Sequence, residues 1–146
     1  MENQVLENHL CFKLYALTRQ INQLYRPVLE AMELTYPQYL VMVVLWTTPK
    51  LYVKDLGEKL YLDSGTLTPL LKRLEQKKLI TRKRCQEDER LVMISITPQG
   101  EALKEKATSI PGAVNKECRF KSADYVQLQH QLDKILATLK HTNETN

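Results

Sequence analysis

The feature that most constrains the fold of this chain is a pair of short helical segments joined by a tight turn near its middle. The first segment has apolar residues at helical spacing, namely Val53, Leu56 and Leu60. Tyr61-Leu62-Asp63 is the turn, and Asp63 or Ser64 can cap the second segment by accepting from the free amides of its first turn. Two helices joined in this way predict a helix-turn-helix.

The second helix has an apolar inner face that continues the pattern. Its members are Leu67, Leu70, Leu71 and Leu74. Pro69 interrupts this helix, because proline has no amide hydrogen and its ring crowds the preceding turn. We therefore expect the regular helix to begin near Thr66, or its first turn to be strained.

A β-hairpin is predicted directly after these helices. Leu79–Arg84 and Leu91–Thr97 read as strands, since Val92, Ile94 and Ile96 alternate with other residues, and the charged segment Cys85–Arg90 joins them. Thr97-Pro98 then starts a further helix, with proline at its first position. A helix-turn-helix followed by a charged hairpin is a winged helix, so the predicted fold class is mostly α with a two-stranded β wing.

The two ends of the chain carry long amphipathic helices. The first stripe comprises Leu10, Leu14, Leu17, Ile21, Leu24 and Val28, and the last comprises Tyr125, Leu128, Leu132, Ile135 and Leu139. Pro111-Gly112 should kink or break the helix before the last one. We expect residues 1–36 and 98–146 to form the dimerisation region of a homodimer, and residues 37–97 the winged helix-turn-helix DNA-binding region. The alternative for the stripes is packing within one chain.

Positive charge collects on the predicted helix-turn-helix and wing. The window from Asp63 to Arg90 holds eight basic and five acidic residues, so it carries most of the chain's net charge of +4. Charge alone proves little, but here it coincides with a recognition helix, which favours double-stranded DNA as the partner. The residues expected to face bases and phosphates are Ser64, Thr66, Thr68, Lys72 and Arg73. Arg90 is expected in a minor groove, and a dimer predicts a pseudo-palindromic operator.

Composition excludes several other classes of protein. No apolar run approaches the ~18 residues of a membrane span, and the N-terminus lacks the features of a signal peptide, so we expect a cytoplasmic protein. The cysteines, Cys11, Cys85 and Cys118, are an odd number at irregular spacing and suit neither a disulfide scaffold nor a zinc site. We expect no metal and no cofactor.

Four stretches resemble the MarR family of dimeric winged-helix regulators, and within it the branch of organic hydroperoxide resistance regulators. They are residues 6–15 (LENHLCFKLY), 34–40 (LTYPQYL), 60–73 (LYLDSGTLTPLLKR) and 88–90 (DER). The cysteine in its LCFxLY setting, together with TYPQY, is specific to the peroxide-sensing branch. The resemblance implies a repressor that binds DNA when reduced and leaves it when an organic hydroperoxide oxidises Cys11.

The same resemblance assigns the sensor pocket to Tyr15, Tyr25 and Tyr36 and the minor-groove arginine to Arg90. Cys11 should lie near the start of its helix, where the helix dipole and free amides favour the reactive thiolate. Cys11 and Tyr25 lie on one predicted helix, roughly 21 Å apart at 1.5 Å per residue. If they touch, either Tyr25 comes from the second subunit, which we favour, or the helix bends sharply.

Some relatives rely on one cysteine and a small thiol, whereas others close a disulfide between subunits with a second cysteine after the wing helix. Cys118 lies in that region, beside Lys116 and Arg119, which would favour its thiolate. We therefore predict an intersubunit Cys11–Cys118 disulfide, although Cys118 matches the relatives by region and not in register. Cys85, in the wing, should take no part.

Two other functions compete with the peroxide-sensing repressor. One is a MarR-type regulator released by a small aromatic ligand, with Cys11 merely structural. The other is a thiol peroxidase, but the chain has no CxxC pair, and half of it is predicted DNA-binding machinery. We therefore expect stoichiometric sensing and no enzyme.

Overall fold

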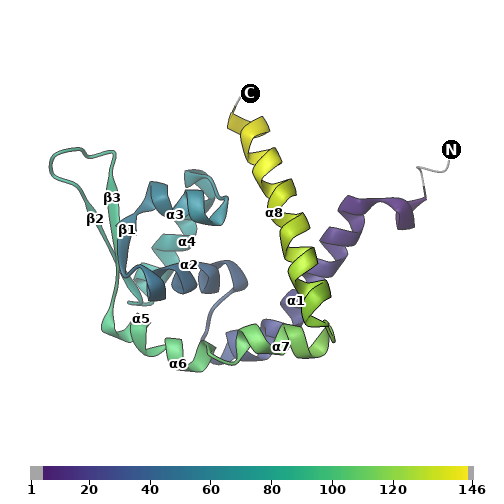
Figure 1. Ribbon diagram of the computed structural model, residues 1–146. Helices are drawn as coiled ribbons and strands as arrows, with labels where there is room; N and C mark the ends of the chain where they lie inside the picture. The colour runs from purple at the N-terminus through teal and green to yellow at the C-terminus, as the bar shows by residue number, and fades with distance from the viewer. Residues whose placement is uncertain (1–4, 145–146) are drawn as a thin grey trace. The chain divides into compact units, whose positions relative to one another are not determined.

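The computed structural model describes residues 5–144 and is mostly helical with a small sheet (Figure 1). The helices are α1 (Leu10–Ala31), α2 (Tyr36–Thr47), α3 (Val53–Leu60), α4 (Ser64–Gln76), α5 (Pro98–Ala102), α6 (Lys104–Ala107), α7 (Ile110–Glu117) and α8 (Ser122–Glu144). The strands are β1 (Lys50–Tyr52), β2 (Ile80–Arg84) and β3 (Val92–Ile96), and a short 3-10 helix, Leu6–Asn8, precedes α1. The chain forms two compact units, one ending at Ile110 and the other beginning at Pro111.

Helix α1 follows the predicted apolar stripe, but little of it is covered within the chain. Among its residues, Leu29 alone is buried in the described structure. Pro27 lies inside the helix without ending it. Large apolar side chains remain exposed along its length, including Leu10, Leu14, Leu17 and Leu24.

Helix α2 lies in the core of the first unit, and the residues that follow Pro37 are mostly apolar. Thr35 and Gln38 form a reciprocal capping box, which fixes the start of the helix. Pro37 lies in the first turn, where its missing amide hydrogen costs nothing. Fully buried side chains around α2 come from several elements, among them Val41, Met42, Leu45, Leu56, Leu67, Leu71, Leu74 and Ile94.

The helix-turn-helix is confirmed as α3 and α4, which lie side by side near the sheet (Figure 1). Tyr61 makes the turn with a left-handed backbone (φ 55°), and Asp63 caps α4 by accepting from the amide of Thr66. Two outcomes were open for Pro69, a helix that begins near Thr66 or a strained first turn, and the first was wrong, because the predicted Asp63 cap starts the helix at Ser64. Pro69 lies within α4 with its ring exposed, so water can solvate the carbonyl left without a helical donor.

The wing is confirmed, but it belongs to a three-stranded antiparallel sheet of order β1-β3-β2 instead of a two-stranded element. In the hairpin, Ile80 pairs with Ile96 and Arg84 with Val92. Strand β1 pairs with the other edge of β3, Lys50 opposite Ser95. A strand of three residues is too short to show an alternating pattern in the sequence, which is why the prediction missed it.

The first helix after the sheet begins at the residues that the sequence predicts. The Thr97 hydroxyl accepts from the Gly100 amide at 3.1 Å and starts α5 at Pro98. Gly100 is required there, because an added Cβ would lie 2.3 Å from the Leu79 carbonyl oxygen. The predicted break near Pro111 is confirmed, since α6 ends at Ala107 and α7 restarts with this proline in its first turn.

Within the described residues, no single helix has both the length and the apolar character needed to cross a membrane. The helices α1 and α2 meet these criteria only as a pair, and they are bent by 71° relative to each other. Helix α2 is largely buried in the core, as expected for a core helix.

Candidate functional site

The exposed face of α4 brings together every residue that the sequence assigned to base and phosphate contact on this helix. All of them are exposed: Ser64, Thr66, Thr68, Lys72 and Arg73. The opposite face packs into the core through Leu67, Leu71 and Leu74. The helix is therefore held by its apolar face while its polar face and two cations remain accessible.

Hydrogen bonds within the chain already engage two of these side chains. Thr66 Oγ1 donates to Asp63 Oδ1 at 2.6 Å, and Thr68 Oγ1 donates to the Ser64 carbonyl oxygen at 2.7 Å. The hydrogen bond from Thr66, helped by backbone amides, holds the pKa of the Asp63 carboxyl below its usual range. Asp63 is therefore a charged helix cap at neutral pH, as the sequence predicted.

The loop between β2 and β3 extends away from the helices and carries Arg90 (Figure 1). The Arg90 side chain is 91% exposed, and its Nε lies 3.2 Å from Asp88 Oδ1. Cys85 is half-buried at the start of this loop, where its amide donates to the Leu91 carbonyl oxygen. The geometry leaves Arg90 accessible to a ligand in solution.

An ion pair that the sequence analysis did not single out fastens the wing to α4. Glu75 Oε2 accepts from Arg82 Nη2 at 2.7 Å and from Nε at 2.9 Å, and Glu75 Oε1 accepts from the Arg82 amide. The Arg82 hydrogen bonds lower the pKa of Glu75. Six residues, which include the turn after α4, separate the partners, so no helical spacing in the sequence indicates the pair.

We expect Glu75→Gln to lower the free energy of unfolding at neutral pH by up to about 1 kcal/mol, because the pair is partly exposed. A folded-state pKa below the ordinary value of 4.5 stabilises the fold above that value, and the contribution is lost as pH falls through the folded-state pKa. Urea unfolding at pH 7 and at about pH 3 should therefore show a difference between variant and wild type that disappears in acid. An equal difference at both pH values would contradict an electrostatic role.

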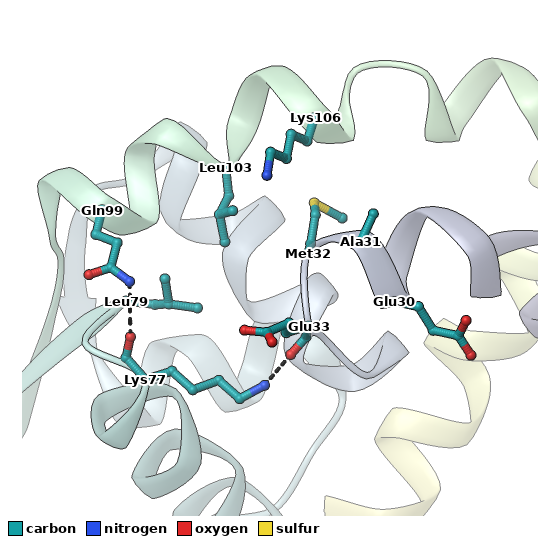
Figure 2. A pocket seen from close by; sticks show the side chains of 9 residues that line it. All are labelled: Glu30, Ala31, Met32, Glu33, Lys77, Leu79, Gln99, Leu103 and Lys106. Atoms are coloured by element: carbon teal, nitrogen blue, oxygen red, sulfur yellow. Dashed lines mark hydrogen bonds between the residues drawn. The ribbon is translucent and has the colours of Figure 1, made fainter.

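The C-terminal end of α4 is hydrogen-bonded to the turn after α1 and to α5, and residues from all three segments line a pocket (Figure 2). Lys77 Nζ donates to the Glu33 carbonyl oxygen, and Gln99 Nε2 donates to the Lys77 carbonyl oxygen. Glu33 and Lys78 both adopt left-handed backbone angles (φ 55° and 61°) where α1 and α4 end. These bonds fix the position of the recognition helix relative to the α1–α2 turn.

Cys11 is the second residue of α1 and is exposed in the single chain. His9 is the cap residue, its side chain makes no capping hydrogen bond, and the first turn has no acidic residue. Cys11 therefore lies in the first turn of α1, where the backbone amides have no acceptor within the helix. The position near the start of the helix is the one predicted from the sequence.

Tyr25 and Tyr36 meet in an aromatic cluster on the first unit. Their rings are stacked, 5.2 Å between centroids and 7° between planes. Tyr39 lies against both and against Trp46, at centroid distances of 6.1 to 6.3 Å. Burial raises the pKa of Tyr36, so its phenol keeps its hydrogen at neutral pH. The sequence analysis assigned two of these four residues to the sensor pocket and did not place Tyr39 or Trp46 in it.

Tyr15 is separate from that cluster and lies four residues after Cys11, on the same face of α1. Its side chain is 59% exposed, and its hydroxyl accepts from Arg19 Nη1 at 3.0 Å. The Arg19 guanidinium also lies over the ring, 5.7 Å from its centroid. The predicted pocket residues thus fall into two groups: Cys11 with Tyr15, and Tyr25 with Tyr36.

Cys118 lies in the second unit, directly after α7, and is half-buried. Its amide donates to the Val114 carbonyl oxygen, and Arg119 follows with a left-handed backbone. Phe120 packs edge-on against Tyr125 of α8.

In the described part of the chain, no group of three or more histidine, cysteine or acidic side chains is placed to hold a metal ion.

These features, an exposed polar face on the second helix of a helix-turn-helix beside a charged β-hairpin, define a winged helix. The family model described as transcriptional regulator SarA/Rot matches residues 6–107. The organic hydroperoxide resistance transcriptional regulator of Bacillus subtilis (strain 168) is 51% identical and is matched over 98% of this chain and all of its own length.

Solved structures of AbfR, a protein of Staphylococcus epidermidis, are similar as well. Reduced AbfR bound to DNA shares 34% identity at a TM-score of 0.77, covering 97% of this chain and 98% of that one. The structure of disulfide-formed AbfR shares 33% identity at a TM-score of 0.64, covering 92% and 95%. The chain therefore belongs to the SarA/Rot family of transcriptional regulators, and its similarity to the B. subtilis regulator confirms the resemblance to organic hydroperoxide resistance regulators found in the sequence.

Proposed function

We propose that this protein is a homodimeric repressor that binds a pseudo-palindromic operator and releases it when an organic hydroperoxide oxidises Cys11. The observation that carries the proposal is the position of Cys11, exposed in the first turn of α1 in a chain half identical to an organic hydroperoxide resistance regulator. The reaction is stoichiometric sensing and not turnover.

The chemistry is a transfer of one oxygen atom. The Cys11 thiolate attacks a peroxide oxygen of ROOH, an S–O bond forms, and the O–O bond breaks. Sulfur is oxidised to the sulfenic acid, while the peroxide is reduced to an alkoxide that takes up a proton and leaves as the alcohol. No cofactor is needed, since the peroxide supplies the oxidising equivalents.

A second copy of the chain completes the sensor. Fourteen residues of continuous helix separate Cys11 from Tyr25, roughly 21 Å at 1.5 Å per residue, so the two cannot meet within one chain. The apolar stripe of α1 is uncovered, and α8 also exposes large apolar residues, namely Val126, Ile135, Leu136 and Leu139. Covering both stripes with a second copy buries this surface and brings the partner's tyrosines towards Cys11.

The DNA contacts are the exposed residues of α4 and the wing. In the proposed complex, α4 lies in the major groove with Ser64, Thr66 and Thr68 at the bases. Lys72 and Arg73 neutralise phosphates, and Arg90 reaches into the minor groove. Two such heads in a homodimer account for a pseudo-palindromic site.

A mobility shift on the protein's own upstream DNA tests the function directly. The reduced protein should retard the DNA, cumene hydroperoxide should release it, and added thiol should restore the complex. A 100-fold loss of affinity requires about 2.7 kcal/mol of difference between the two forms. Retention of the complex after oxidation would refute the sensing function, and absence of a complex with the reduced protein would refute the repressor.

Tyr25→Phe and Tyr36→Phe should each leave DNA binding nearly unchanged but slow the oxidation of Cys11. The phenol of Tyr36 is protonated at neutral pH, so it can donate to the thiolate across the dimer. The measurement is the rate of Cys11 thiol loss with cumene hydroperoxide. Tyr61→Phe is a matched control, because Tyr61 is exposed in the turn before α4. Equal rates in all four proteins would remove both tyrosines from the pocket.

We also propose that Cys118 resolves the oxidised sensor. Its thiolate attacks the Cys11 sulfenic sulfur of the other subunit, an S–S bond forms, and hydroxide leaves and is protonated to water. Cys118 is half-buried directly after α7, in the region where the second cysteine is expected from the resemblance.

A non-reducing gel after hydroperoxide treatment should show a covalent dimer that is lost in Cys118→Ser and retained in Cys85→Ser. The Cys85 variant is the matched control, because that thiol lies in the wing. A monomer band in oxidised wild type, with a mass gain on Cys11 alone, would assign the protein to the one-cysteine type instead.

A further inference from the structure

We propose that Thr66 and Thr68 contact DNA as hydrogen-bond acceptors and therefore select bases with an exocyclic amine, adenine or cytosine, in the major groove. The inference rests on the proposed function, because it requires α4 to lie in a major groove. It adds a rule for which bases this helix can select.

The argument begins with the hydrogen atoms of the two hydroxyl groups. A threonine hydroxyl has one hydrogen to donate and two lone pairs to accept with. In Thr66 that hydrogen is given to the Asp63 carboxylate at 2.6 Å, and in Thr68 it is given to the Ser64 carbonyl oxygen at 2.7 Å. The Asp63 bond is charge-assisted and short, which makes it the stronger of the two. Both side chains are exposed, so their remaining lone pairs face the solvent.

These two hydrogen bonds decide which groups on DNA can pair with the threonine hydroxyls. Phosphate oxygens only accept hydrogen bonds, and so do guanine N7 and O6 and thymine O4. A contact with any of them would require the threonine to give up its bond inside the protein. The donors that the major groove presents are the N6 amine of adenine and the N4 amine of cytosine. Those two amines are therefore the complementary partners.

Ser64, at the start of the same helix, differs in this respect. Its hydroxyl makes no hydrogen bond within residues 5–144, so it keeps its hydrogen for a phosphate or a base acceptor. Helical geometry places Gly65 and Pro69 between the two threonines on the exposed face. Neither has a long side chain, so the backbone of α4 can come close to the base edges.

The test starts with selection of bound duplexes from a random library by the reduced wild-type protein. We expect enriched positions at which adenine or cytosine is preferred. A selected adenine is then replaced by purine, which lacks the exocyclic amine, or a selected cytosine by its analogue without the 4-amino group. Wild type should lose affinity about 5-fold for each such replacement, the value of one hydrogen bond of about 1 kcal/mol.

The variants assign the amines to the residues. Thr66→Val or Thr68→Val should each make binding insensitive to the loss of one amine, and Thr66→Ser, which keeps the hydroxyl, should restore the sensitivity. Thr108→Val is the matched control, because its hydroxyl also donates to a backbone carbonyl, that of Glu105, outside α4. Enriched duplexes with no amine-dependent position would overturn the inference alone. Enrichment of no sequence by wild type would overturn the proposed DNA binding with it.

Discussion

Replacing Cys11 by serine should give a protein that binds its operator nearly as tightly as wild type and stays bound after organic hydroperoxide treatment. Serine has nearly the same size, and Cys11 is exposed in the single chain, so little packing is lost. Its hydroxyl cannot be oxidised by the peroxide, so the switch has no trigger. After peroxide treatment, the variant should bind the operator about 100-fold more tightly than wild type, a difference of about 2.7 kcal/mol in binding free energy.

The measurement is a binding titration of reduced and peroxide-treated protein on the same duplex. Cys85→Ser is the matched control, since it removes a thiol from the wing and should respond like wild type. Dissociation of the Cys11→Ser complex on oxidation would show that Cys11 is not the sensor. In that case another oxidisable residue, such as Cys118, would be the trigger.

Arg90→Ala should weaken binding of the reduced protein to its operator by about 1–3 kcal/mol. The side chain projects from the wing at 91% exposure and is held within the chain by one contact to Asp88. A cation that enters a narrow minor groove gains more from the concentrated negative potential there than one that rests on an open phosphate. The loss should therefore be greatest on duplexes with an A·T tract under the wing.

The chain offers a close control for this arginine. Arg26 also pairs through Nε with a carboxylate, Glu30, at 2.8 Å, and its side chain is 74% exposed. Arg26→Ala removes the same charge from α1 instead of the wing and should change operator affinity little. Titrations at several salt concentrations separate a specific contact of Arg90 from the general loss of one positive charge. A general charge effect changes the slope of operator affinity against salt concentration. Equal losses in both variants would leave Arg90 as one charge among many.

Much of the DNA-binding head could be predicted from the sequence because its signals are local. The spacing of leucines in α4, the Asp63 cap and the Thr97-Pro98 start of α5 are each contained within a few residues. The same local reasoning left a start of α4 near Thr66 open because of Pro69, and that alternative was wrong. The expectation that proline disrupts a helix considers the helix alone. In the folded chain, burial of Leu67, Leu71 and Leu74 keeps α4 helical on both sides of Pro69.

The parts that could not be predicted depend on contacts between segments distant in the chain. Strand β1 exists because β3 pairs with it, and the aromatic cluster exists because α1 packs against α2, placing Tyr25 on Tyr36 and Tyr39. The resemblance supplied the two stacked tyrosines, but Tyr39 has no local signal that separates it from any buried core residue. The Glu75–Arg82 pair likewise depends on how the wing folds back on α4.

The tie between α1 and α4 sets a practical limit on exchanging parts between regulators of this kind. Leu29, Met32 and Leu34 belong to the same buried core as α2 and α4, and Lys77 is hydrogen-bonded to Glu33, between Met32 and Leu34. A chimera that takes its DNA-binding head from this chain and is joined at Pro37 would lack these three side chains. The core of the transplanted head would then lose the contacts they make. A working transplant of the DNA-binding head would have to carry the last turn of α1 with it, with the joint placed before Leu29.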